Sequence, residues 1–338
     1  MQATLTAQSQ TTSVQKLPFM VRFFQVFESL GVLALLLIVV IVASIIAPGF
    51  FTSTNLTNLV ITASITAVTG FGMTLAIAMG GFDLSVGSAQ ALTAIVAAAL
   101  LPLVSIPGAI VGALLAGLVI GFVNGVVISK LRVPAFVATL GMMGIARGVA
   151  LLVTNGQSLL IVGHNDYALL NNGRVLGIPV PFIIALVTLV VFYILLQHTP
   201  FGRHVCAVGG NVGAAIASGI SVDRITIAVF GLVGITAALS GVMLSTKLLI
   251  VNGTLGVGFE LQVIAISVLG GTSLTGGGGN LPGTLLAALL LAAISSALNI
   301  LKVPPFYQYL ALGLLLIFAL VLDTLRRGIV TRVVLRGR

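Results

Sequence analysis

The sequence predicts an all-α, polytopic membrane protein with about ten transmembrane helices, pseudo-repeated halves and broken helices. Of its 338 residues, 59% are hydrophobic and only 6% are charged, whereas roughly 25% of the residues in a soluble domain are charged. Several apolar runs exceed the ~18 residues that indicate a membrane-spanning helix. Ten-residue segments of alternating hydrophobicity, which are typical of membrane β-barrels, do not occur in the sequence.

The hydropathy pattern divides the chain into three regions. We expect a polar cytoplasmic N-terminal tail over 1–28, a transmembrane domain over 29–323 and a basic cytoplasmic C-terminal tail over 324–338. The first apolar run continues to Ile46 without a small-residue cleavage site, which favours a retained span over a signal peptide. No hydrophilic stretch is long enough to bury a core of its own.

Ten spans are predicted, and an even number places both termini on one side of the membrane. The spans cover 29–48, 56–79, 84–103, 107–129, 135–153, 180–197, 224–246, 259–272, 282–301 and 305–323. The side of the termini also holds Lys130, Arg132, Arg203 and Arg224, whereas the opposite side holds only Arg174, Lys247 and Lys302. Because basic residues concentrate on the cytoplasmic side, both termini are expected in the cytoplasm.

The net charge of +9 does not indicate a nucleic-acid partner. Lys and Arg lie mainly in the short hydrophilic breaks and in the C-terminal tail. That distribution indicates membrane orientation and attraction to anionic lipid headgroups. The single cysteine, Cys206, cannot form an internal disulfide.

The segment 80–88 places a carboxylate between two apolar runs. An unpaired aspartate near hydrocarbon costs on the order of 3 kcal/mol, so Asp83 is expected to be paired, at a water-facing turn or part of a site. We expect Asp83 or Ser85 to be the N-cap of the next helix, at the cytoplasmic ends of the two spans. The alternative is a polar site that uses the amides of a helix N-terminus to contact a substrate.

Arg147 lies about 12 residues into the fifth span, which is roughly 18 Å along a helix. A guanidinium at that depth needs a carboxylate, backbone carbonyls or a wet cavity. Asp83 and Glu260 are the acidic candidates, and a structural pairing or carbonyl contacts are expected. The alternative is a position lining a translocation pathway.

The two longest breaks fall on opposite faces of the membrane. The stretch 154–179 faces outward and the stretch 198–223 faces the cytoplasm, and both are expected to contact partners rather than to serve as mere connectors. Within the second stretch, Asn211 is a good N-cap, 212–218 forms a short helix of small residues, and Gly219 ends it. Small side chains would let this helix approach a partner closely.

An internal echo relates 79–85 to 269–275. Both segments follow an apolar run, and both carry a Gly-Gly pair before a second apolar helix. Matched glycine-interrupted segments in two halves indicate a transport path, and coincidence in a glycine-rich chain is the alternative.

Enzymatic readings find little support in the sequence. The run 274–280 is glycine-rich but lacks the lysine and Ser/Thr of a phosphate loop, so no ATPase site is expected in this chain. The three histidines lack metal-ligand spacing, and Cys206 lacks an orienting third group. A secondary transporter would need coupling-ion carboxylates inside the membrane, and only Asp83 and Glu260 are candidates.

Several short motifs together point to one family. They occupy 80–87, 124–125, 134–141, 199–203, 207–211, 259–261 and 268–277, with Gln308 and Asp323. On these residues the chain resembles the permease subunits of bacterial ABC importers for monosaccharides of the ribose, xylose and arabinose type, in the branched-chain amino acid/sugar permease superfamily. The resemblance covers roughly 29–323.

The resemblance implies a division of labour in the inner membrane. A periplasmic sugar-binding protein would deliver the sugar, two permease chains, identical or paralogous, would form the pathway, and a cytoplasmic ATPase would bind ATP and Mg²⁺. No cofactor or metal is expected in this chain. Another cargo, such as a sugar-like signal molecule or a branched-chain amino acid, remains an alternative. Phe82 stands where Ile is common in the family. Ser295-Ser296 also departs from the family pattern, and because this span is a candidate for lining the pathway, the departure bears on the identity of the cargo.

The residues and the resemblance together give two sets of candidate site residues. The ATPase-coupling set consists of Gly202, Arg203, Gly210, Asn211, Ala214, Ala215 and Gly219. The pathway or helix-break set consists of Gly80, Gly81, Asp83, Ser85, Asn124, Thr139, Arg147, Glu260, Gly270, Gly271, Ser295, Ser296 and Asn299.

Overall fold

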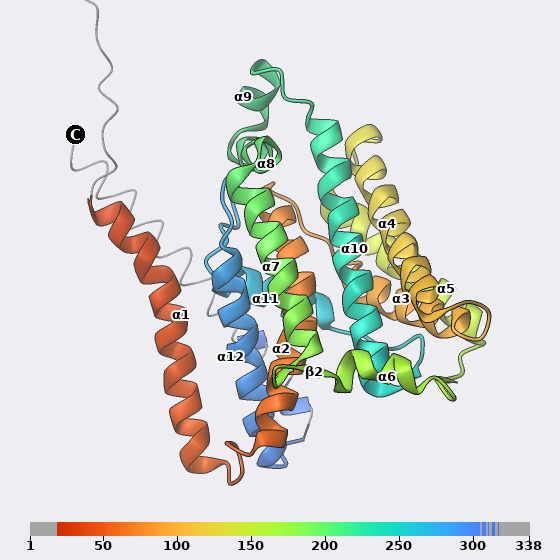
Figure 1. Ribbon diagram of the computed structural model, residues 1–338. Helices are drawn as coiled ribbons and strands as arrows, with labels where there is room; N and C mark the ends of the chain where they lie inside the picture. The colour runs from red at the N-terminus through yellow and green to blue at the C-terminus, as the bar shows by residue number, and fades with distance from the viewer. Residues whose placement is uncertain (1–18, 305, 309, 311–312, 315–316, 318–338) are drawn as a thin grey trace, which may run out of the picture.

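The computed structural model describes residues 19–304, 306–308, 310, 313–314 and 317 (Figure 1). Its long helices are α1 (Phe19–Ile46), α2 (Ser53–Ala78), α3 (Val86–Leu100), α4 (Ile106–Lys130), α5 (Ala135–Thr154), α7 (Val180–His198), α10 (Val222–Leu248) and α12 (Leu281–Ile300). The shorter helices are α6 (Asn165–Asn172), α8 (Pro200–Gly210), α9 (Val212–Ala217) and α11 (Phe259–Leu269). Four two-residue strands are β1 (Leu159–Leu160), β2 (Arg174–Val175), β3 (Ile178–Pro179) and β4 (Ile250–Val251).

Nine of the ten predicted spans coincide with helices. Six helices of the described residues are long and apolar enough to cross a membrane, and the result is a multi-pass α-helical membrane protein. The tenth predicted span, 305–323, falls mainly outside the described residues, as does the tail 324–338. Helix α1 begins at Phe19, inside the predicted tail 1–28, because the sequence from there to Gly31 is rich in apolar residues and free of proline and glycine.

Two predicted spans are shorter than expected. The spans 84–103 and 259–272 correspond to α3, with 15 residues, and α11, with 11 residues. At 1.5 Å per residue these helices measure about 22 and 16 Å, against the ~30 Å of a hydrocarbon core. Non-helical backbone at such depth is tolerated where protein covers it. The prediction of broken helices is therefore confirmed, while the two lengths were wrong.

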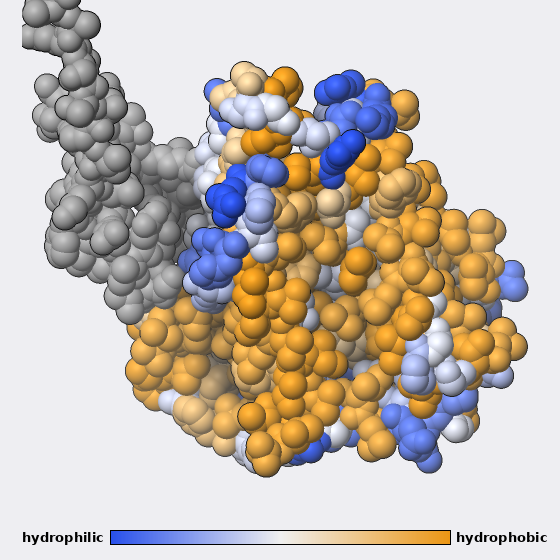
Figure 2. Space-filling model, turned by 45° about the horizontal axis from the view of Figure 1, so that its top comes forward, coloured by the Kyte–Doolittle hydropathy of each residue, from blue (hydrophilic) through white to orange (hydrophobic). Residues whose placement is uncertain are grey.

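The molecule has two distinct ends (Figure 1). The α9 end carries α8, α9 and the start of α1, and the α6 end carries α6 and β2. Figure 2 shows apolar residues covering most of the flank between these ends, with hydrophilic residues gathered in the upper part of the view and at its lower right. An apolar belt between two polar ends is the surface that a bilayer requires.

The core lies where α10 packs against α2, α3 and α4. The largest of these contacts joins α10 to α4. There a Cβ added to Gly117 would overlap the carbonyl oxygen of Gly234, and one added to Gly121 would overlap that of Phe230. Backbones this close are typical of membrane helices that meet at small residues.

The stretch 154–179 is folded onto the α6 end. Strand β1 pairs with β4, and β2 pairs with β3 in a second small ribbon. The buried hydroxyl of Tyr167 on α6 lies 2.6 Å from the Ser245 hydroxyl on α10. This contact anchors α6 to the core helix.

The predicted short helix at 212–218 is confirmed as α9. The Asn211 side chain accepts a hydrogen bond from the amide of Ala214 at 2.9 Å, and Gly219 ends the helix with φ +80°. The sequence analysis missed α8, although Thr199 caps it by accepting from the Gly202 amide at 3.3 Å and Pro200 occupies its first position. A threonine followed by proline is a recognisable helix start.

Candidate functional site

Most of the candidate pathway residues fall into three groups. The first surrounds Asp83 at the start of α3, the second surrounds Arg147 on α5, and the third lies on α12. The remaining pair, Gly270 and Gly271, follows the end of α11. The first two groups meet through the N-terminal turns of α3 and α11.

Asp83 is buried, with 1% of its surface exposed. Its Oδ1 accepts hydrogen bonds from the Ser85 amide at 2.8 Å and from the Ser85 hydroxyl at 2.5 Å. Its Oδ2 accepts from the Asn124 amide nitrogen at 3.3 Å, and that nitrogen also donates to Ser85 Oγ at 3.0 Å. Among the described residues no cation pairs with Asp83, so hydrogen bonds alone compensate its burial.

The N-cap prediction for this segment is confirmed in its position, at Ser85, and wrong in its hydrogen bonding. Ser85 occupies the N-cap position of α3, but no side chain accepts a hydrogen bond from the first-turn amides of that helix. Asp83 instead accepts from the amide two residues ahead, which is an Asx-turn. The carboxylate of Asp83 therefore stabilises the turn that leads into α3, and it lies two residues before the N-cap residue Ser85.

Asp83 is held by a residue that lies deeper than the helix ends. Its partner Asn124 lies six residues before the end of α4 at Lys130, or about 9 Å along the helix. The break runs between the end of α2 at Ala78 and the start of α3 at Val86, as the predicted spans require. Its place at the cytoplasmic ends of the two spans stays a prediction.

Thr139 on α5 completes the first group. Its hydroxyl is buried and lies 3.4 Å from the carbonyl of Phe82, while its better-placed acceptor is Ala135 at 2.8 Å. A Cβ on Gly81 would lie 3.7 Å from the Cβ of Ala135. The start of α3 is therefore held between α4 and α5, and the sequence prediction of these residues as candidates is consistent with their proximity.

Arg147 binds backbone carbonyls, as expected. One of its guanidinium nitrogens donates to the carbonyls of Gly253 and Leu255 at 2.6 and 2.5 Å. These carbonyls belong to the loop 252–258, which leads into α11. Asp83 is not a partner of Arg147. Glu260 does not form an ion pair with it within 4 Å.

The N-terminal turns of α3 and α11 touch inside the protein. A Cβ on Gly87 would overlap the carbonyl oxygen of Gly256 and would lie 2.6 Å from a carboxylate oxygen of Glu260. One helical turn further on, the buried Gln90 donates to Ser240 on α10 at 2.6 Å. Sequence analysis missed Gln90 and Ser240. The signal was a large amide in an otherwise apolar run.

The internal echo corresponds to two matching helix ends. After α2, the amides of Gly80 and Gly81 donate to the carbonyls three and five residues back, and Gly80 has φ +90°. After α11, the amides of Gly271 and Thr272 do the same, and Gly271 has φ +94°. Both are Schellman motifs. The sequence alignment of the echo was out by one residue, because Gly80 matches Gly271 and not Gly270.

Gly270 has a separate packing role. A Cβ there would overlap the amide of Thr284 on α12, so α11 and α12 approach closely at this point.

The candidates on α12 lie away from the other two groups. Ser296 donates to the side chain of Asn55 on α2 at 2.8 Å, and Asn299 accepts from Gln308 at 2.7 Å. Ser295 is half-buried on the same helix. These contacts lie toward the α6 end, where α2 begins.

The coupling candidates form the surface of the α9 end. Arg203, Gly210, Asn211, Ala214 and Gly219 are exposed, whereas Gly202 and Ala215 are buried. On α9, two apolar side chains one turn apart, Val212 and Ile216, are 49% and 58% exposed.

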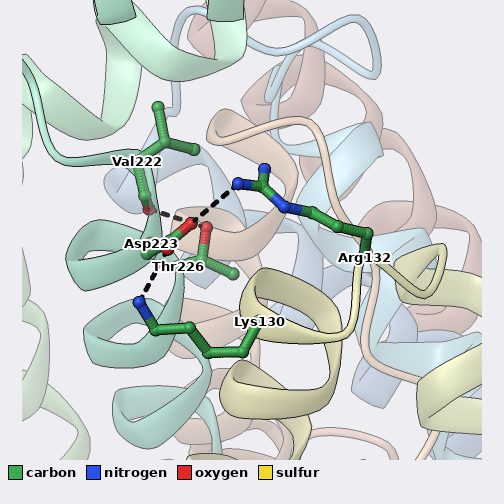
Figure 3. Close-up of polar contacts among 5 residues, drawn as sticks. All are labelled: Lys130, Arg132, Val222, Asp223 and Thr226. Atoms are coloured by element: carbon green, nitrogen blue, oxygen red, sulfur yellow. Dashed lines mark hydrogen bonds and ion pairs between the residues drawn. The ribbon is translucent and has the colours of Figure 1, made fainter.

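A three-residue ionic cluster lies at the same end (Figure 3). Asp223, near the start of α10, is 2.8 Å from Lys130 Nζ and 3.8 Å from an Arg132 nitrogen. The cluster ties the end of α4 to the start of α10, just beyond α9. It is exposed to solvent, so screening by water keeps its contribution to stability small.

A polar hollow of about 240 Å³ opens at the α6 end. Arg174 on β2 donates to Thr57 on α2 at 3.2 Å beside it. Its lining consists of Ser53, Thr54, Thr57, Asn58, Ile61, Asn171, Asn172, Gly173, Arg174 and Pro179. Among the described residues no three His, Cys, Asp or Glu side chains gather as a metal site.

Comparison with known proteins gives one consistent result. The family described as branched-chain amino acid transport system, permease component, matches residues 55–320. The ribose import permease of Escherichia coli strain K12 is 42% identical over 302 residues, which cover 88% of this chain and 93% of that protein. The Bacillus subtilis ribose import permease is 39% identical over 90% of this chain and 95% of its own length. The L-arabinose ABC transporter permease of Azospirillum brasilense is 37% identical over 90% of each chain. No solved structure matches the chain.

Proposed function

Because the chain belongs to the family of branched-chain amino acid transport system permease components, we propose that it is the transmembrane permease subunit of an ABC importer for a monosaccharide. The observation that carries this proposal is the 42% identity to a ribose import permease across 88% of the chain. The relatives named for L-arabinose import support the same cargo class. In this role the chain forms the translocation pathway in the bacterial inner membrane.

The proposed importer divides the work among several chains. A periplasmic binding protein delivers the sugar to the α6 end, where the polar hollow and the folded stretch 154–179 offer a surface. A separate cytoplasmic ATPase binds ATP and Mg²⁺ and docks at the α9 end. This assignment makes the α9 end cytoplasmic, and the exposed Lys130 and Arg132 at that end agree with the positive-inside rule.

Helix α9 is suited to dock into a groove of the ATPase. Val212 and Ile216 expose apolar surface on adjacent turns, and the exposed Ala214 permits close approach. Asn211 and Gly219 fix the two ends of the helix. Ala215 is buried and holds α9 against the rest of the protein.

Replacing Ala214 by arginine is expected to prevent docking of the ATPase without unfolding the permease. The side chain is exposed, so arginine has room in the isolated chain but obstructs a closely fitted partner. The measurement is co-purification of the cognate ATP-binding subunit, followed by ATP-driven uptake of radiolabelled D-ribose and L-arabinose in proteoliposomes. Leu176→Arg, at a site 97% exposed on the α6 end, adds the same charge and should leave co-purification intact. Full ATPase binding by Ala214→Arg would rule out α9 as the docking element.

A second permease chain, identical or paralogous, is expected beside α5. Only four of the 20 residues of α5 are buried within the chain. Gly141, Gly144 and Gly148 on this helix have open space where a side chain would be. Glycines spaced in this way let two membrane helices approach closely.

Replacing Gly144 by leucine should therefore weaken pairing of permease chains. The open space predicts normal folding, because a Cβ at Gly144 meets no heavy atom within 4 Å and leucine is a better helix former than glycine. The measurement is the fraction of paired permease on chemical cross-linking in membranes. Leu152→Ala, on the same helix at a side chain that is 76% exposed, is the control for a change of apolar bulk. Pairing that is equally strong in Gly144→Leu would place the second chain elsewhere.

A further inference from the structure

Three segments that are distant in sequence meet backbone to backbone beneath α8. They are the last turn of α8 at Gly209, the end of α2 at Ala78, and the glycine loop 274–280 that joins α11 to α12. We call this contact the glycine junction and define it by Ala78, Gly209, Gly276 and Gly277. None of these four residues belongs to the predicted site sets.

The contact between α8 and α2 leaves no room for a side chain. A Cβ on Gly209 would overlap the carbonyl oxygen of Ala78 and would lie 2.8 Å from the amide nitrogen of Gly277. Ala78 is fully buried and is the last residue of α2. A backbone carbonyl cannot rotate aside as a long side chain can, so Gly209 fixes the distance between the two helices.

The glycine loop closes the junction from the other side. The Gly277 amide donates to the Ala78 carbonyl at 2.8 Å. A Cβ on Gly276 would lie 2.6 Å from the Gly209 carbonyl oxygen. Both loop glycines have positive φ, +78° and +85°, which side-chain-bearing residues rarely adopt. The loop therefore takes the shape that the end of α8 requires.

The glycine junction lies next to both helix breaks and to α9. Immediately after Ala78 comes the first Schellman turn, at Gly80, and then the segment that carries Asp83. Immediately before the glycine loop comes the second Schellman turn, at Gly271. On its third side the junction continues through Gly210 and Asn211 into α9. One rigid contact thus connects the proposed ATPase-docking helix to both helix breaks.

We propose that the glycine junction is the coupling joint of the transporter, with Gly209, Gly276 and Gly277 as positioning residues that transmit movement of α8 and α9 to both breaks at once. The proposal rests on the importer function proposed above. A push on α9 reaches the ends of α2 and α11 through backbone contacts, with no flexible side chain between them. A side chain at Gly209 would push α8 away from α2. Helix α9 could then still bind the ATPase and move with it, but its movement would no longer be transmitted to the two helix breaks.

The test compares Gly209→Ala with Gly278→Ala in the purified complex of permease, ATP-binding subunit and sugar-binding protein. Both changes add one methyl group to a glycine, one in the last turn of α8 and the other in the glycine loop 274–280. The added Cβ overlaps the backbone of Ala78 in the first variant and meets nothing within 4 Å in the second. The readout is D-ribose or L-arabinose transported per ATP hydrolysed in proteoliposomes. A purely structural defect would lower transport and hydrolysis together and leave this ratio unchanged.

We expect Gly209→Ala to retain the ATPase and its hydrolysis but to transport about tenfold less sugar per ATP, within the usual range of coupling between sites. Gly278→Ala should keep the wild-type ratio. If a folded Gly209→Ala complex transports as much sugar per ATP as the wild type, the glycine junction is not the coupling joint. If the wild-type complex itself neither binds an ATPase nor takes up sugar with ATP, the proposed function fails instead.

A graded series in the glycine loop keeps the proposal testable if Gly209→Ala does not fold. A Cβ on Gly278 meets nothing, and one on Gly279 meets only side-chain atoms, those of Thr74 at 2.8 Å, Leu196 and Ala78. One on Gly276 meets the backbone of Gly209. The ratio should fall in the order Gly278→Ala, Gly279→Ala, Gly276→Ala. Equal ratios for the folded members of the series would contradict the joint.

Discussion

Replacing Asp83 by alanine is expected to destabilise the permease by about 3 kcal/mol and to stop uptake, whereas asparagine should support near-normal transport. Alanine leaves the buried Ser85 amide without its acceptor and removes the Asn124 partner, and an unsatisfied buried donor costs about 1–3 kcal/mol. Asparagine keeps an oxygen for the Ser85 amide. The side chain of Asn124 can turn its own oxygen toward the new amide group.

The comparison separates hydrogen bonding from charge. Thermal unfolding in detergent reports the stability, and ATP-driven uptake of radiolabelled sugar reports the function. Ser88→Ala is a matched control in the same segment, because its hydroxyl donates to a local carbonyl of its own helix turn. If asparagine abolishes uptake as completely as alanine does, while both variants stay folded, the negative charge of Asp83 is itself required.

Local signals in the sequence were enough to predict most of the fold. Hydropathy located the nine spans that the described residues test, and the Asn211 to Gly219 pattern located α9 with its cap and its stop. Each of these features depends on residues within one or two helical turns. Such features can be recognised without knowledge of the tertiary structure.

The depth of the helix breaks depends instead on residues far apart in sequence. Asp83 lies inside the protein because Asn124, 41 residues away, donates to it. Arg147 is satisfied by carbonyls more than 100 residues away, and no side-chain pattern identifies which carbonyls an arginine will reach. The contacts of Gly209 with Ala78 and Gly277 are also purely backbone contacts. Hydropathy and motif spacing carry no information about such contacts, so the sequence prediction of Arg147 could name only the kind of partner.

The short lengths of α3 and α11 have the same origin. Both segments are apolar enough to be predicted as spans. Each helix is nevertheless short, because the backbone at its start is held by contacts with another segment of the protein. Gly87 meets Gly256, and the Arg147 guanidinium holds the carbonyls just before α11. Polar backbone in these breaks is satisfied by protein groups rather than by further helical turns. The two breaks are therefore built by tertiary contacts, and changing those contacts should affect the breaks without changing the long helices.

Arg147→Met provides the sharpest test of that statement. Methionine keeps an unbranched apolar side chain on α5 but removes the donor shared by the carbonyls of Gly253 and Leu255. Two unsatisfied carbonyls predict a loss of about 3 kcal/mol. They also predict faster hydrogen exchange localised to 252–258 and the first turn of α11, with uptake lost. Lysine should recover part of the stability, because its ammonium can donate to these carbonyls but lacks the rigid fork of arginine.

Hydrogen exchange distinguishes this local effect from general unfolding. Arg174→Met removes a guanidinium that is exposed and reaches only a threonine hydroxyl, at 3.2 Å, so its exchange pattern at 252–258 should match that of the wild type. If Arg147→Met leaves exchange at 252–258 unchanged, the loop is held by other contacts, and Arg147 acts in the pathway itself. Both carbonyls lie in the loop just before the short helix α11. The faster hydrogen exchange expected in Arg147→Met should therefore start in this loop, while the amides of α10 keep their wild-type protection.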